Sequence, residues 1–149
     1  MKMTGFKLLI ILSLIGCANS NADTPIAPNY EQMKITISFG QTKLTATLYD
    51  NPTSRDLIAQ MPITTELEDY AGNEKIFYPD RKSTRYGAPA GYQPSTGDIT
   101  YYAPWGDVAI FYQDFSHAPG LISLGKIEDN GIELLKNVGN QLVTFELAE

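Results

Sequence analysis

The sequence predicts a mainly β domain, a small closed antiparallel barrel of eight strands with two short helices. Short segments that alternate apolar and polar residues indicate half-buried strands. Clusters of glycine, proline and asparagine separate these segments, as turns do. So many strands in so short a chain favour closure, because a closed sheet has no free edges to aggregate. A two-sheet sandwich is the alternative.

The domain is expected to begin with a hairpin and a helix. Residues 34–39 alternate apolar and polar side chains, and residues 44–48 do so again after a glycine-containing turn. Asn51 then offers a helix N-cap, and Pro52 suits a first helical turn. A short helix should follow and end at Pro62.

The remaining elements are predicted at similar spacing. Further strands are expected at residues 63–67, 74–78, 98–102, 107–112, 122–127 and 142–147, and a second helix at residues 132–136. Residues 79–96 form one long irregular stretch that is rich in glycine and proline. Loops of this length inside compact domains are usually functional or mobile.

Cys17 is the only cysteine and stands where a secretory signal would end. Residues 1–16 carry two lysines and an apolar run that is too short for a membrane-spanning helix, so they are expected to be a signal peptide. Leu14-Ile15-Gly16-Cys17 resembles the lipobox of bacterial lipoproteins. That resemblance implies acylation of Cys17 and, because Ala18 and not aspartate follows, an outer-membrane anchor facing the periplasm. An ordinary cleaved signal is the alternative.

A tether and one folded domain should follow the signal. Residues 17–32 are rich in asparagine and proline and lack an apolar pattern, so they are expected to be flexible, with a reach of roughly 20 Å. Residues 33–149 then form one domain, which we expect to be monomeric. A single cysteine allows no internal disulfide, so stability must come from the core.

The charge of the chain excludes several partners. Without Lys2 and Lys7, 9 basic residues face 17 acidic residues, a net charge near −8. Nucleic-acid binding needs a basic surface, which this composition does not offer. Anionic lipid should repel the domain, so the acyl group is expected to be the only membrane contact. No dinucleotide fingerprint, phosphate loop or nucleophile elbow appears, and no cofactor is expected.

Residues 97–112 hold the most specific pattern. They read Gly-Asp-Ile-Thr-Tyr-Tyr-Ala-Pro-Trp-Gly-Asp-Val-Ala-Ile-Phe-Tyr, two strands around a Pro-Trp-Gly turn. This block resembles the small bacterial cyclophilin-like proteins, as do the Asn51-Pro52-Thr53 helix start, the Met61-Pro62 step and Leu124-Gly125-Lys126-Ile127. The resemblance covers nearly all of residues 33–149 and implies an eight-stranded cyclophilin-type barrel.

The resemblance implies less about activity. Prolyl isomerases of the cyclophilin type carry a Phe-His-Arg segment and a Phe-Met-x-Gln-Gly-Gly segment, and this chain has neither. Isomerisation needs an apolar pocket and a donor, typically arginine, beside a twisted amide. A peptidyl-prolyl isomerase is therefore the alternative to a binding module, and a purely structural role is the third possibility.

The favoured hypothesis is a domain that binds a peptide or a small apolar ligand. Aromatic rings at the barrel rim can stack on such a ligand, and an arginine can meet its carbonyl or carboxylate. The candidate ligand-binding residues are Arg55, Tyr78, Arg85, Tyr102, Trp105, Phe111 and Tyr112, with Phe115 nearby. Strand alternation must send about half of these rings into the core, and Phe111 is a candidate core residue. Trp105 should be exposed, because it lies in a Pro-Trp-Gly turn.

The sequence contains two weaker patterns, a partial set of metal ligands and a group of neighbouring carboxylates. Asp114 and His117 could supply metal ligands together with Asp98 or Asp107, but a full ligand set is missing, and no metal site is expected. Glu66, Glu68 and Asp69 offer paired carboxylates of the kind that glycosidases use, yet acidic residues at a strand end are commonly solvated.

Overall fold

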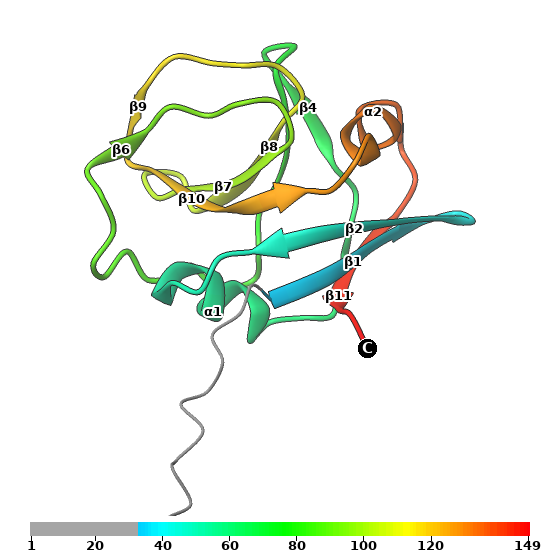
Figure 1. The fold of residues 1–149 in the computed structure, drawn as a ribbon, viewed down its shortest axis with the longest axis horizontal. Coiled ribbons are helices and arrows are strands. Elements are labelled where there is room, and N and C mark those ends of the chain that lie inside the picture. The colour runs from blue at the N-terminus through cyan, green and yellow to red at the C-terminus, as the bar shows by residue number, and fades with distance from the viewer. Residues whose placement is uncertain (1–32) are drawn as a thin grey trace, which may run out of the picture.

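The computed structural model describes residues 33–149, so the expected signal peptide, Cys17 and the tether lie outside the described residues. A sheet of nine strands dominates the domain, and all its neighbouring strands are antiparallel (Figure 1). Their spatial order is β3 (Ile63–Thr65), β11 (Val143–Leu147), β1 (Met33–Phe39), β2 (Thr42–Leu48), β10 (Leu121–Ile127), β7 (Asp98–Tyr102), β8 (Asp107–Phe111), β5 (Glu74–Phe77) and β4 (Glu68–Tyr70). A second, two-stranded sheet pairs β6 (Gly91–Tyr92) with β9 (Ala118–Pro119).

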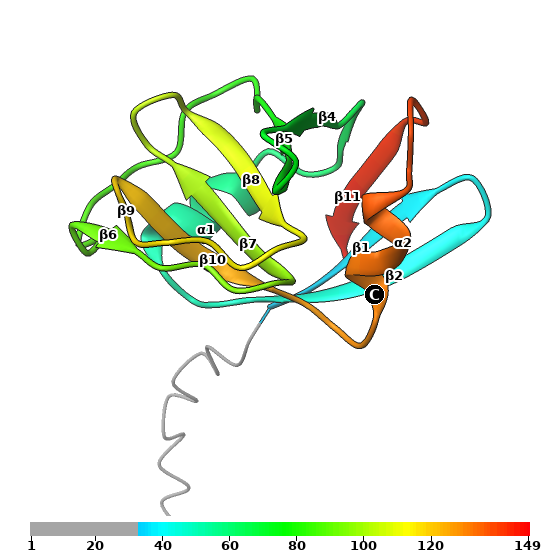
Figure 2. The same ribbon diagram turned by 90° about the horizontal axis from the view of Figure 1, so that it is seen from above.

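The large sheet curls into an open half-barrel. Seen from above, β1, β2 and β11 form one wall, and β7, β8 and β10 form the other (Figure 2). Phe77 of β5 stacks on Phe145 of β11 with their ring centroids 4.8 Å apart, so strands that are far apart in the sheet order meet across the core. The two edge strands, β3 and β4, are joined by residues 66–67 alone.

The prediction of a closed eight-stranded barrel is wrong, whereas the prediction of a mainly β domain with two short helices is confirmed. The segment 63–67, predicted as one strand, ends after Thr65 as β3, and the chain then turns to the opposite edge and forms β4. Both edge strands are only three residues long, and β4 carries Glu68 and Asp69. Short, charged edges resist aggregation, so the sheet does not need closure.

Two helices complete the inner core. α1 (Pro52–Ile58) begins as predicted, with the Asn51 Oδ1 accepting a hydrogen bond of 2.8 Å from the Ser54 N–H. α2 (Gly131–Lys136) precedes β11. Leu57 of α1 and Leu135 of α2 are buried in the same cluster as the inward-facing residues of the sheet. The helices therefore add apolar surface to the core that the half-barrel encloses.

The sheet is also covered on part of its outer face. Ile76, Ala109, Phe111 and Leu121 form a second buried cluster there. Tyr92 of β6 and Ala118 of β9 pack against it, and Figure 1 shows both strands at the same side of the domain, where β6 contacts β10. Strand β8 is consequently buried along its whole length, as strands covered on both faces are.

Candidate functional site

Beside this outer cluster lies a cavity of about 230 Å³ that we call the aromatic pocket. Five aromatic side chains, three from strands and two from the turn and the loop on either side of β8, line it together with one carboxylate. The lining residues are Tyr70, Ala71, Asn73, Glu74, Tyr102, Trp105, Phe111, Phe115, Ala118, Pro119 and Leu121. Ligand sites in proteins are typically concave and mostly apolar with a few polar groups, and this cavity has that character.

Strand register builds one wall of the aromatic pocket. Tyr70 of β4 pairs with Glu74 of β5, and Glu74 pairs in turn with Phe111 of β8. Directly opposed residues of antiparallel strands point to the same face of the sheet. The carboxylate of Glu74 therefore stands in a row between two aromatic side chains.

The turn between β7 and β8 supplies Trp105. Its backbone N–H and that of Gly106 both donate to the carbonyl of Tyr102, at 3.2 and 2.8 Å, and Gly106 has a φ of +76°. The Trp105 ring makes edge contacts with the rings of Tyr70 and Tyr102, with centroids 5.4 Å apart in each case. It is 46% exposed, as the Pro-Trp-Gly turn predicts. A ligand in the pocket can thus contact this ring.

Two acidic groups on this face have perturbed proton affinities. Burial, with a further contribution from the Asp107 charge, raises the pKa of Glu74 to about 7. Burial likewise raises the pKa of Asp107 to about 6. Within residues 33–149 the Asp107 Oδ1 finds no hydrogen-bond partner. Both carboxyls therefore titrate close to neutral pH, where their charge responds to whatever occupies the neighbouring space.

The structure brings together only three of the predicted ligand-binding residues, namely Tyr102, Trp105 and Phe111. Phe111 is 3% exposed and belongs to the buried outer cluster, so it is a core residue as well as part of the pocket wall. Tyr78 is 53% exposed just beyond β5 and lines a different, smaller cavity.

The two predicted arginines lie elsewhere. The Arg55 Nε on α1 donates to the Asp50 Oδ1 at 2.6 Å. Arg85 lines a small separate cavity in the long loop, next to Ala88 and Pro89. Neither arginine is among the residues that line the aromatic pocket.

Tyr112 was also predicted at the ligand site, and the structure places it outside the lining of the aromatic pocket. It follows Phe111 directly, and alternation sends its side chain into the inner core cluster. Its hydroxyl donates to the Asp69 Oδ1 at 2.6 Å, and the Lys136 Nζ lies 5.3 Å from its ring centroid. The hydrogen bond from Tyr112 lowers the pKa of Asp69. Tyr112, which directly follows β8, thus contacts both β4 and α2.

The model of the Cyclophilin-like family matches residues 37–146. The chain belongs to the Cyclophilin-like family. Among solved structures, a hypothetical protein from Archaeoglobus fulgidus is similar, with a TM-score of 0.59, 19% identity, and coverage of 83% of this chain and 100% of that one. A likeness at this identity shows the fold alone. No curated protein matches the chain.

Sequence reasoning missed two residues of this cyclophilin-like site, Tyr70 and Glu74. The predicted strand at residues 63–67 stopped before Tyr70, because acidic residues are depleted in strands. A usable signal was Ala71-Gly72, where φ values of +52° and +67° and the hydrogen bond from the Asn73 N–H to the Tyr70 carbonyl form a tight hairpin turn. Recognising that hairpin would have opposed Tyr70 to Glu74.

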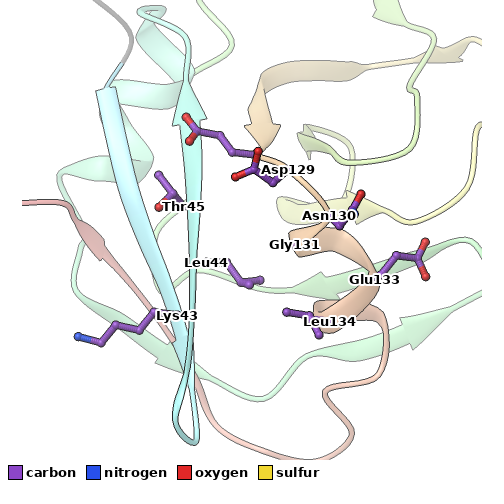
Figure 3. Close-up of a pocket in the computed structure, with 9 residues that line it drawn as sticks. Lys43, Leu44, Thr45, Asp129, Asn130, Gly131, Glu133 and Leu134 are labelled. Atoms are coloured by element: carbon purple, nitrogen blue, oxygen red, sulfur yellow. The ribbon is translucent and has the colours of Figure 1, made fainter.

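The cyclophilin-like domain has other hollows, and none combines aromatic walls with predicted site residues in the same way. A cavity of about 430 Å³ lies between β2 and α2, where Leu44 and Leu134 extend toward one another and Lys43 points away (Figure 3). Asp129 and Glu133 also line it, and it contains no aromatic residue. A third cavity, of about 270 Å³, lies between the start of α1 and the long loop near Tyr86.

The residues of the two weaker sequence patterns have ordinary structural positions: Glu68 and Asp69 are exposed on β4, and Asp114 binds Thr96. The Asp114 Oδ1 accepts hydrogen bonds of 2.8 and 2.9 Å from the backbone and hydroxyl of Thr96, and these bonds lower the pKa of Asp114. No group of three or more potential metal-ligating side chains occurs in the described part of the chain. The helices within residues 33–149 are all too short or too polar to cross a membrane.

Proposed function

We propose that this cyclophilin-like domain binds a peptide or a small apolar ligand in the aromatic pocket. The observation that carries the proposal is the convergence of Tyr70, Tyr102, Trp105, Phe111 and Phe115 on one small cavity. Tyr70 is distant in sequence from the other four rings, and a partly exposed tryptophan among them leaves apolar surface in contact with water. Covering such surface with a ligand is favourable, and aromatic stacking adds to the gain.

The same pocket gives little support to the alternative of a prolyl isomerase. That reaction needs a donor, typically arginine, next to the twisted amide. The residues that line the aromatic pocket include no arginine, and Arg55 and Arg85 lie in other places. Binding without catalysis is therefore the function that this geometry favours.

We further propose that the domain is held at the outer membrane, facing the periplasm, by acyl chains on Cys17. Support comes from the resemblance of residues 14–17 to a lipobox. Cys17→Ser removes the only acylation site, so the variant should appear in the soluble fraction. A variant that stays on membranes after a high-salt wash would contradict the anchor and leave the binding proposal standing.

Binding is tested by a thermal-shift screen of small apolar compounds and proline-containing peptides, since a ligand of the folded state raises the melting temperature. Trp105→Ala should weaken each hit by roughly 2- to 10-fold, equivalent to the 0.5–1.5 kcal/mol typical of an aromatic contact beyond its buried area. Tyr78→Ala is the matched control, because it removes an exposed ring outside the pocket.

Three results would count against the binding proposal. If Trp105→Ala leaves the affinity for the hits unchanged, the binding site lies elsewhere. An unfolded Trp105→Ala variant would show that the residue is core. Accelerated isomerisation of a proline peptide, lost in Arg55→Ala or Arg85→Ala, would replace the binding module with an isomerase.

A further inference from the structure

We propose that the ligand of the aromatic pocket is a small organic cation, a methylated ammonium compound, which the rings surround and the Glu74 carboxylate balances. This inference rests on the proposed function and names the class of ligand. Three observations support it. They are the arrangement of the rings, the lack of a counter-charge for the Glu74 carboxylate, and the charges on this face of the sheet.

The rings are suited to a cation. Tyr70, Tyr102 and Trp105 form a cluster in which Trp105 meets both tyrosines edge to face at centroid distances of 5.4 Å. The face of an aromatic ring carries partial negative charge and attracts cations, tryptophan most strongly. Cages of several rings are the usual way in which proteins recognise methylated ammonium groups.

Glu74 lacks a counter-charge within the domain. Within residues 33–149 its carboxylate takes part in no hydrogen bond or ion pair, and the nearby carboxylate of Asp107 repels it. The residues that line the pocket include no lysine, arginine or histidine. A partly buried carboxylate without a partner is costly, so a cation bound beside it would relieve that cost.

The surrounding charges select the same class of ligand. Glu68 lies two residues before Tyr70 on β4 and faces the same side of the sheet, and Asp107 is on that side too. Lys75, the neighbour of Glu74, instead reaches across the opposite face to Asp69, with 3.4 Å between its Nζ and the Oδ1. Lys82 lies beside Gly106 in the neighbouring turn but does not line the pocket, so the only charged group in the lining is Glu74, which attracts cations and repels anions. The cavity of about 230 Å³ suits a free headgroup-sized compound.

The experiment compares two probes of matched shape. Choline carries a trimethylammonium group, and 3,3-dimethyl-1-butanol is its neutral isostere, with carbon in place of nitrogen. Isothermal titration calorimetry on the purified protein should show choline binding at least tenfold more tightly than the alcohol. Equal binding of both would overturn the cation inference but support an apolar pocket. Absence of binding by either probe, in a protein that binds other hits of the thermal-shift screen, would also overturn it.

Variants assign the charge preference to Glu74. Glu74→Gln keeps the shape of the side chain and removes its charge, so choline affinity should fall about tenfold while the affinity for the neutral alcohol stays the same. Glu68→Gln is the control, because it removes an acid on the same face that does not line the pocket. If both variants lose choline affinity equally, the effect comes from the overall negative charge of this face, and the specific role of Glu74 is overturned.

The pH dependence gives a second reading that needs no mutation. The titratable groups on the same face as Glu74 are Glu68 and Tyr70 from β4, Tyr102 from β7 and Asp107 from β8. Since the pKa of Glu74 is about 7, a cation should displace its proton, and choline affinity should rise from pH 6 to pH 8. Affinity that is constant over this range would contradict the proposal.

Two further probes separate the possible sources of the cation. Phosphatidylcholine vesicles and a peptide containing trimethyllysine present the same group on a membrane or on a protein. Competition by free choline against either probe supports the assignment of a methylated ammonium group. Binding to vesicles or to the peptide without any binding of free choline would overturn the assignment to a small compound.

Discussion

Glu74 is the residue on which the character of the site depends most. It occupies a strand position between Tyr70 and Phe111, where alternation alone would favour another apolar side chain. Burial and the charge of Asp107 raise the pKa of its carboxyl to about 7, far above the ordinary value of 4.5. When such a carboxyl is ionised, it lowers the stability of the ligand-free domain, and binding sites commonly have this property.

That pKa predicts how stability depends on pH. Between pH 4.5 and pH 7 the folded domain keeps a proton on Glu74 that the unfolded chain has lost, so stability should fall as pH rises through this window. The pKa of Asp107 is raised to about 6, so this residue should also lower the stability of the domain as the pH rises from about 4 to 6. The melting temperature of the native protein and of Glu74→Gln, measured from pH 4 to pH 8, checks this.

The variant should be the more stable protein at pH 8 and should show a flatter profile than the native protein. At pH 4 the difference in stability between the two proteins that depends on the Glu74 charge should have disappeared. The Glu74 side chain is then protonated in both the folded and the unfolded state. A native protein that gains stability from pH 5 to pH 7 would contradict the account.

At the scale of elements, alternation was a good guide to strands but a poor guide to where they end. The strands at residues 98–102 and 34–39 and the helix capped by Asn51 were predictable, because their patterns and caps are local. β4 was not, because its sequence Glu-Asp-Tyr has no alternation to read and it exists only through pairing with β5. Tertiary pairing overrides weak strand preference in this way.

β10 packs closely against β2 at Gly125. Its register shifts between Ser123 and Gly125, leaving Leu124 in an irregularity of the sheet. A Cβ added to Gly125 would lie 2.0 Å from the Thr47 carbonyl oxygen and 2.8 Å from the Leu48 Cα. Backbone atoms cannot move aside as a flexible side chain can, so β2 approaches this closely only because residue 125 is a glycine.

Gly125→Ala should therefore lower the free energy of unfolding by about 1–3 kcal/mol, as overpacking in a core does, or prevent folding. Gly139→Ala serves as the comparison: no atom lies within 4 Å of its added Cβ, and its cost should be only the strain of its φ of +62°, about 1–2 kcal/mol. Urea unfolding measures both. A fully tolerated Gly125→Ala would show that β2 and β10 can separate.

For the whole molecule, the sequence predicted a single β-rich domain of the Cyclophilin-like family but not the openness of its sheet. Closure was inferred from the need to protect the sheet edges, and in this protein both edge strands are short and one of them, β4, is acidic. The candidate site was predicted in part. Tyr102, Trp105 and Phe111 come from one local block, whereas Tyr70 joins them only through the curl and pairing of the sheet.

The most direct test of ligand binding in the aromatic pocket uses the single tryptophan of the chain. Trp105 lines the pocket and is partly exposed, so its fluorescence reports on that site alone. Titration with choline, and with each hit of the thermal-shift screen, should shift Trp105 emission to shorter wavelength and saturate at the concentration that raises the melting temperature. Ligands that stabilise the protein while leaving Trp105 emission unchanged would contradict this account.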